Sequence, residues 1–248
     1  MIGLILGTGM EAGISAGKWA SVATEFGIAV VERVQVEGRD VMLVNRHGDK
    51  HSILPHMINY KANIAALRDA GVTRIIATAA VGSIRNDLAP GSLVIAGDFI
   101  DWHRGRPITI FDADSASLTH TDFSVPYCPE VSAAIESAMI ETGLPVHPRV
   151  VYVSADGPRY ETPAEIRMFA RLGGDVVGMT GAPEAILAKE MGLCYGSIAI
   201  VSNFAAGISA EPLTHEEVTR SVAEKSEEVR RLIKATIMRL SDKCETCG

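Results

Sequence analysis

The chain has 248 residues, of which 47% are apolar and 21% are charged, and its formal net charge is -7. This size and composition fit a globular α/β protein and exclude a disordered or fibrous chain. The acidic balance argues against an extended nucleic-acid surface, so an anionic substrate has to be held by a local site. No segment reaches the roughly 18 to 20 apolar residues that a membrane-spanning helix requires.

The first residues predict a strand, because residues 1–7 lack a basic region and their apolar run is too short for a signal peptide. We therefore expect a cytoplasmic protein that does not associate with membranes. Strand-like runs follow at residues 28–36, 39–44, 74–78, 92–96, 149–153, 176–179 and 194–201.

Helical patterns separate several of these runs. Helices are predicted at residues 59–70, 163–172 and 183–191, and a last helix begins with the capping box Thr214-x-x-Glu217 and extends to Leu240. This alternation predicts an α/β fold with a mixed sheet covered by helices on both faces. Since no repeat or linker interrupts it, we expect a single domain over residues 1–248, in which residues 241–248 form a flexible tail.

Four cysteines are too few for a disulfide scaffold at this length. Cys128 and Cys194 lie in apolar sequence and are predicted to be small core residues. Cys244 and Cys247 form a Cys-x-x-Cys pair, but a structural zinc would need two further ligands, and no second pair stands at a suitable spacing. We therefore predict no metal site; a terminal redox pair and chance composition both stay open.

Small or polar segments follow three of the predicted strands. Gly7-Thr8-Gly9 can direct backbone N–H groups and a hydroxyl at an anion, although it is neither a P-loop nor a dinucleotide fingerprint. Asn45-Arg46-His47-Gly48 adds a guanidinium fork that matches phosphate oxygens. Residues 78–83 are small enough to let a ligand approach the backbone. A tight turn, a solvated loop and close helix–sheet packing are the structural alternatives.

Three later segments carry groups that suit a planar heterocycle. Residues 155–162 include Tyr160 beside Glu161, residues 178–181 include Met179 beside Thr180, and residues 202–205 include Asn203. An aromatic face, a carboxylate acceptor and an amide together can bind a ring that presents a donor edge.

Together these segments resemble the trimeric purine nucleoside phosphorylase and methylthioadenosine phosphorylase family, from Gly7 to Val218 and in the family's order. The resemblance implies an α/β fold around a central mixed, partly barrel-like sheet, a homotrimer or a dimer of trimers, and no metal or organic cofactor. Inorganic phosphate is then a co-substrate. One departure is Leu6, where many relatives carry glycine, and it leaves Thr8 in place.

The resemblance also implies roles for single residues. The phosphate site would consist of Thr8, Arg46, His47, the backbone of Ala79 and Ala80, and Thr180. The nucleoside site would consist of Tyr160, Glu161, Met179, Asn203, Ala205, His215 and His120, the last near a subunit boundary. Asn203 and His47 would be the catalytic residues. Phosphate stabilises the positive charge on the sugar, and a hydrogen bond at N7 stabilises the leaving base.

Three positions bear on the choice of nucleoside. Methylthioadenosine enzymes resemble one another in carrying serine at the position of Glu161 and aspartate at those of Asn203 and Ala205. Glu161 can accept from N1–H of a 6-oxopurine, and the amide of Asn203 can both accept and donate. His215 resembles a histidine that binds the ribose 5′-hydroxyl in 6-oxopurine enzymes, whereas the Arg46 loop and the His120 segment look more like the methylthio branch.

The sequence therefore predicts phosphorolysis of inosine and guanosine to free base and ribose 1-phosphate. The alternative is the same reaction on 5′-methylthioinosine or methylthioadenosine. A catalytically silent nucleoside-binding protein is a further alternative. A nucleoside hydrolase is not indicated, because the Asp-rich calcium site of those enzymes is not apparent.

Overall fold

The computed structural model describes residues 1–7, 10, 13–48, 52–105, 108–111, 120–209, 213–241 and 243–246, apart from the side chain of His215. Within these residues, no helix has the length and apolar character needed to cross a membrane.

The nine strands that the structure describes form one mixed sheet, in the order β2-β3-β4-β1-β5-β8-β7-β6-β9. β9 also pairs with β5, so β5, β8, β7, β6 and β9 close into a ring. This arrangement confirms the partly barrel-like sheet. The strands are β1 (Ile2–Leu6), β2 (Ala20–Thr24), β3 (Gly27–Val36), β4 (Arg39–Asn45), β5 (Arg74–Ser83), β6 (Leu93–Trp102), β7 (Val150–Ala155), β8 (Val176–Gly178) and β9 (Cys194–Phe204).

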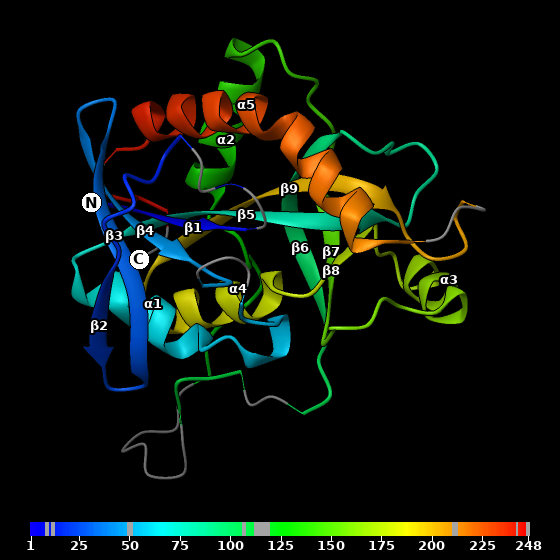
Figure 1. Cartoon of the computed structure of the whole chain (residues 1–248), viewed down its shortest axis with the longest axis horizontal. Coiled ribbons are helices and arrows are strands. Elements are labelled where there is room, and N and C mark those ends of the chain that lie inside the picture. The colour runs from blue at the N-terminus through cyan, green and yellow to red at the C-terminus, as the bar shows by residue number, and fades with distance from the viewer. Residues whose placement is uncertain are drawn as a thin grey trace.

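Helices cover both faces of this sheet (Figure 1). α2 (Pro129–Glu141) and α5 (His215–Arg239) pack on one face, while α1 (Tyr60–Asp69) and α4 (Gly181–Glu190) pack on the other. Each pair encloses its own hydrophobic core against the strands. α3 (Pro163–Arg171) lies beside the ring at one end of the molecule, and a single 3-10 turn, η2 (Pro55–Met57), precedes α1.

Two elements are absent from the sequence prediction. β2 has no clean apolar alternation because it is a mostly exposed strand that pairs with β3 as a hairpin. α2 was missed although its buried residues recur at helical spacing (Val131, Ser132, Ala134, Ile135, Ala138 and Met139).

The helix caps agree with the sequence prediction in part. Thr214 Oγ1 accepts from Glu217 N–H at 3.1 Å, which in the described structure is half of the predicted capping box. The complete box lies at α3, where Thr162 and Glu165 bond each other's backbone N–H groups. At the end of α1, Ala70 is the C-cap and Gly71 has a φ of +79°, as expected for a terminating glycine.

α2 lies so close to β9 that Gly196 leaves no space for a side chain. A Cβ at this position would lie 2.4 Å from Val131 Cγ1. We expect Gly196→Ala to destabilise the protein by about 1 to 3 kcal/mol, which lowers Tm by roughly 2 to 4 °C per kcal/mol. Gly105→Ala is the control, because a Cβ there meets nothing within 4 Å. Equal Tm values for the two variants in thermal denaturation would contradict this packing.

Candidate active site

A cavity of about 350 Å³ opens where β4, β5, β8 and β9 end. It brings together side chains from segments far apart in the chain. Of the predicted site residues, those that line it are Arg46, His47, Ala79, Ala80, Tyr160, Glu161, Met179, Thr180, Asn203 and Ala205.

The cavity lies where β5 changes its neighbour in the sheet. β1 pairs with β5 up to Ala77, and β8 pairs with it from Gly82 onward. On that edge, the described pairings leave residues 78–81 without a neighbouring strand. Ligands bind at such switch points in α/β sheets, because backbone groups there are not engaged in the ladder. The backbone of Ala79 and Ala80 is therefore placed where a ligand can reach it.

Arg46 follows β4 and is fully buried against Glu184 of α4. Its Nε and Nη2 donate to the two carboxylate oxygens at 2.5 and 2.8 Å, and Nη1 donates to Thr78 O at 2.8 Å. Burial alone lowers the pKa of Arg46, but the charge of Glu184 outweighs it and holds that pKa above its ordinary value. Arg46 therefore stays charged, and it retains one N–H on each Nη atom for an anion.

His47 is oriented by the loop that precedes η2. Its Nδ1 lies 2.9 Å from Ile53 O, while Ile53 N–H donates to His47 O at 2.9 Å. Because a carbonyl only accepts, Nδ1 carries the proton in this contact. The other ring nitrogen, Nε2, can then accept from a protonated phosphate, or donate to a phosphate when the ring is an imidazolium.

Thr180 stands at the N-cap of α4, where the helix dipole favours an anion. Its hydroxyl makes no capping bond in the described structure, and it lines the cavity. Tyr152 Oη, 3.5 Å from Thr180 N, fixes the approach of this segment. A Cβ at Gly178 would lie 2.0 Å from that hydroxyl, so this position requires glycine.

Asn203 is directed into the cavity by a bulge in β9. The register between β5 and β9 shifts so that Val81 faces Val201 while Gly82 faces Asn203, which leaves Ser202 as the extra residue. Ser202 Oγ donates to Asn203 Oδ1 at 2.8 Å, and Asn203 Nδ2 donates to Phe204 O at 2.8 Å. These bonds fix the amide orientation and leave it one further N–H and one further lone pair.

Glu161, Tyr160 and Met179 form the wall beside Asn203. Burial raises the pKa of the Glu161 carboxyl above its ordinary value. Gly157, with a φ of +64°, lets the loop that carries Tyr160 and Glu161 pack against Met179, since a Cβ there would lie 2.4 Å from the Met179 sulfur.

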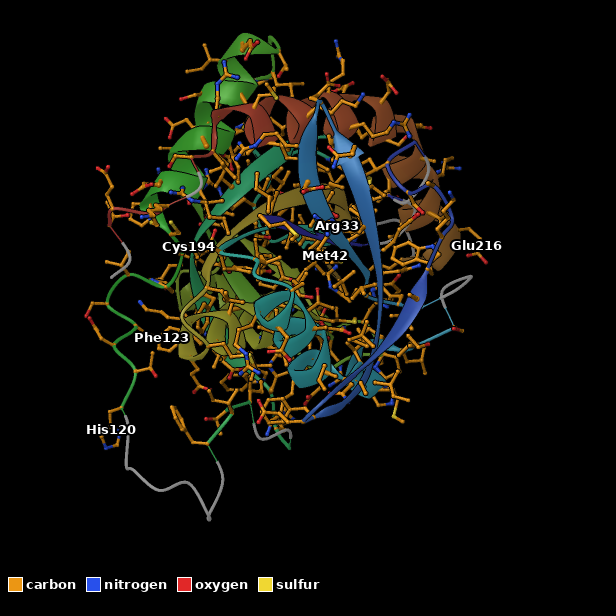
Figure 2. The ribbon with its side chains drawn as sticks, turned by 90° about the vertical axis from the view of Figure 1, so that its left-hand side faces the viewer. Arg33, Met42, His120, Phe123, Cys194 and Glu216 are labelled. Carbon is orange, nitrogen blue, oxygen red and sulfur yellow. The ribbon has the colours of Figure 1, made fainter. Side chains whose placement is uncertain are left out.

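The described structure does not place three of the predicted residues in the cavity. Thr8 and the side chain of His215 lie outside the described residues, although Leu213 and Val218 line the cavity on either side of His215. His120 is exposed on a segment that extends away from the body of the molecule. Figure 2 shows it across the full width of the molecule from Glu216, in the first turn of α5.

Sequence reasoning missed the residues that support the site from behind. Glu184 holds Arg46, Tyr152 holds the approach to α4, and Ser202 orients Asn203. A carboxylate inside the otherwise small and apolar start of α4 was the available signal for Glu184, because a buried charge requires a partner. Tyr152 and Ser202 gave no signal, since their contacts depend on tertiary structure.

Comparisons with known proteins agree with this geometry. The sequence model of a family described as the phosphorylase superfamily matches residues 1–238. This chain belongs to the phosphorylase superfamily. Among its relatives, a 6-oxopurine nucleoside phosphorylase of Pyrococcus furiosus is 48% identical, with 92% of this chain and 88% of the relative covered. A probable S-methyl-5′-thioinosine phosphorylase of Methanothermobacter thermautotrophicus is 44% identical, with 96% and 83% covered.

Solved structures of the superfamily share the fold as well. Methylthioadenosine phosphorylase from Schistosoma mansoni in complex with adenine superimposes with a TM-score of 0.90 at 30% sequence identity, with 99% of this chain and 93% of that chain covered. The superfamily members therefore include proteins named for both oxo- and aminopurine substrates, and the base preference of this chain depends on its own side chains.

The Arg46–Glu184 pair generates a stability prediction. Glu184→Gln removes the charge that compensates a buried guanidinium, so we expect a loss of about 3 to 5 kcal/mol in the free energy of unfolding. Glu228→Gln is the control, because its partner Lys225 is a partly exposed neighbour on α5 and such pairs contribute under about 1 kcal/mol. Urea denaturation measures both; a loss for Glu184→Gln no larger than that of the control would contradict the role of the pair.

The raised pKa of Glu161 generates a pH prediction for the substrate-free protein. Because the folded carboxyl binds its proton more tightly than the unfolded one, ionisation destabilises the fold as pH rises above the ordinary glutamate value. Glu161→Gln should therefore gain stability relative to the wild type as pH rises above that value.

Glu165 is the matched control, because hydrogen bonds from Arg159 lower its pKa to about 2. Its contribution is present above the ordinary pKa and is lost as pH falls, so Glu165→Gln should lose stability relative to the wild type at neutral pH. The measurement is Tm as a function of pH, and the same sign for both variants would contradict the assignment.

Proposed function

We propose that this protein catalyses phosphorolysis of 6-oxopurine nucleosides, inosine and guanosine, to free base and ribose 1-phosphate. The observation that carries the proposal is the meeting of Glu161 and Asn203 in the same cavity as Arg46, His47 and Thr180. Glu161 and Asn203 suit a purine that presents N1–H. The other three residues suit phosphate. Relatives named 6-oxopurine or probable 6-oxopurine nucleoside phosphorylase, at 45 to 48% identity, support the same substrate class.

Phosphate occupies the side of the cavity formed by the ends of β4 and β5 and the start of α4. Arg46 supplies a permanent charge and two N–H groups, Thr180 supplies a hydroxyl, and the dipole of α4 favours the anion. The backbone of Ala79 and Ala80 lies at the unpaired edge of β5. Phosphate held in this way is positioned against C1′ of the nucleoside. Its attack on C1′ therefore does not require the two reactants to meet from solution.

The bond between C1′ and the base then breaks. The sugar gains positive charge, which the bound phosphate dianion stabilises, and the leaving purine gains negative charge. The Asn203 amide, fixed by Ser202 and the Phe204 carbonyl, is set to donate its remaining N–H to the 6-oxo group and to accept from N7–H of the base through Oδ1. Because these dipoles are oriented before the reaction, no reorganisation is required in the transition state.

Base selection depends on Glu161. As a carboxylate it accepts from N1–H of hypoxanthine or guanine, whereas adenine offers a lone pair at N1 and leaves the carboxylate without a donor. The burial of Glu161 makes an unpaired carboxylate costly, and the same burial raises the pKa of this group. Sites that leave a buried polar group unpaired discriminate by as much as about 10⁴.

A second candidate substrate is 5′-methylthioinosine. Leu213, just before α5, and Val218, in its first turn, give the cavity an apolar surface that suits a thioether. Relatives named probable S-methyl-5′-thioinosine phosphorylase, at 37 to 44% identity, favour it as well. The base contacts with Glu161 and Asn203 are unchanged in this candidate.

We also propose that the active form is a homotrimer. His120, predicted to approach the 5′ end of the sugar, lies far from the start of α5 within its own chain (Figure 2). Its segment therefore suits the cavity of a neighbouring subunit. Sedimentation analysis measures the assembly, and a monomer that retains full activity would contradict this part of the proposal.

The experiment that tests the function is phosphate-dependent release of base from inosine, guanosine, adenosine, methylthioadenosine and methylthioinosine, compared as kcat/KM. Inosine or guanosine should exceed adenosine by at least about 10². Preference for methylthioinosine would select the second candidate, and preference for methylthioadenosine would overturn the interpretation of Glu161 and Asn203. Release of base without phosphate, or none at all, would overturn phosphorolysis.

Asn203→Asp tests the amide directly. An added negative charge beside N7 and the 6-oxo group should lower kcat/KM for inosine by more than about tenfold, because it replaces a donor by an acceptor where negative charge develops. The ratio of adenosine to inosine activity should rise. Asn63→Asp on α1 is the matched control, since it adds the same charge at a residue that does not line the cavity. Unchanged inosine kinetics in Asn203→Asp would contradict the assigned role.

A further inference from the structure

Three cysteines that are far apart in the sequence meet at the opposite end of β9 from Asn203. The Sγ atoms of Cys128, Cys194 and Cys244 all lie within 4.8 Å of one another, and those of Cys128 and Cys244 are 3.7 Å apart. The cluster lies outside the lining of the active-site cavity. It brings two further thiols to Cys244 that the sequence prediction did not place there.

The core fixes the positions of two of these sulfur atoms. Cys194 is the first residue of β9, and its N–H donates to Thr73 O at 3.0 Å. Cys128 is the N-cap of α2, and its N–H donates to Tyr195 O at 2.9 Å, directly after Cys194. Both side chains are buried, at 4% and 5% exposure. Their separation is therefore determined by the packing of α2 against β9.

The chain after α5 is anchored so that Cys244 reaches this pair. Arg74, which is 1% exposed at the start of β5, donates through Nη2 to Ser241 Oγ at 3.0 Å and also to Lys243 O. Glu130 accepts from the N–H groups of Glu245 and Thr246 at 2.7 and 3.0 Å. The described part of residues 241–248 is thus hydrogen-bonded to the rest of the protein on both sides of Cys244.

We propose that Cys128, Cys194 and Cys244 bind one thiophilic cation, Zn²⁺, as thiolates. Zinc–sulfur bonds of about 2.3 Å in a tetrahedral arrangement separate the sulfur atoms by about 3.8 Å, close to the distance observed between Cys128 and Cys244. Soft thiolate ligands select zinc or Cu(I) over the harder divalent ions. Each thiol that binds releases its proton to solvent, so three protons are released per ion.

Charges of both signs lie beside the cluster. The N-terminus of α2, which begins at Cys128, presents its positive dipole end to the cluster. Arg74 adds a buried positive charge, which Glu130 partly offsets at 2.9 Å. Cys247 lies outside the described residues, so the site as proposed has three protein ligands and a fourth position for another donor. The ion would join the C-terminal segment to α2 and β9 and stabilise the fold.

The test uses the full-length protein, reduced and freed of metal with a chelator. Titration with Co²⁺, followed by Zn²⁺, should give a sulfur-to-cobalt charge-transfer absorption that saturates at about one equivalent and that zinc abolishes. Zinc should raise Tm. Cys128→Ser, Cys194→Ser and Cys244→Ser should each weaken zinc binding at least about tenfold. Cys244→Ser is the most informative, because it changes a partly exposed residue outside the helices and strands.

Ser132→Ala is the matched control, since it alters a buried residue on α2 one turn from Cys128 and leaves all three thiols in place. It should bind zinc as the wild type does. Absence of the charge-transfer absorption in reduced wild-type protein, or equal zinc affinity in Cys244→Ser, would overturn the proposal. A disulfide that forms within the cluster and persists when zinc and a thiol reductant are both present would overturn it as well. None of these outcomes depends on the proposed phosphorolysis.

Discussion

The buried ion pair between Arg46 and Glu184 connects the parts of the fold that form the active site. Arg46 extends from the end of β4 and also bonds Thr78 O in β5, while Glu184 belongs to α4 and accepts a third hydrogen bond from Tyr195 of β9. Both charges are almost completely excluded from water, so each requires the other. The guanidinium is consequently held at the cavity wall with a fixed orientation.

Closure of the ring supplies the second constraint. Since β9 pairs with β5 along nearly its whole length, the residues at the ends of these two strands face the same cavity. The change of neighbour from β1 to β8 exposes the backbone of β5, and the bulge at Ser202 turns Asn203 inward. This pair of strands thus brings Ala79, Ala80 and Asn203 to one cavity, while β4, α4 and the loop after β7 supply other parts of its wall.

The amino ends of the same two strands carry one cysteine of the cluster and the arginine that anchors the chain after α5. Arg74 begins β5 and Cys194 begins β9, whereas Ala79 and Asn203 lie toward the carboxyl ends. At about 3.3 Å per residue, Cys194 and Asn203 are separated by roughly 30 Å along β9. A metal ion at the amino end would therefore stabilise the sheet without contact with the reacting atoms, and chemistry and stability can be measured independently.

The sequence by itself determined the α/β class, most strands and helices, and the segments that line the cavity, because apolar periodicity and residues such as Gly71 act locally. It also indicated Glu161 and Asn203 as residues of the nucleoside site, because the hydrogen bonds that a carboxylate and an amide can make follow from these groups alone. Only the tertiary structure decided that Arg46 is paired with Glu184, that Ser202 orients Asn203 and that Cys128 and Cys194 meet Cys244. These contacts join residues brought together by sheet closure, by a bulge and by helix packing, and no spacing along the chain encodes such distances.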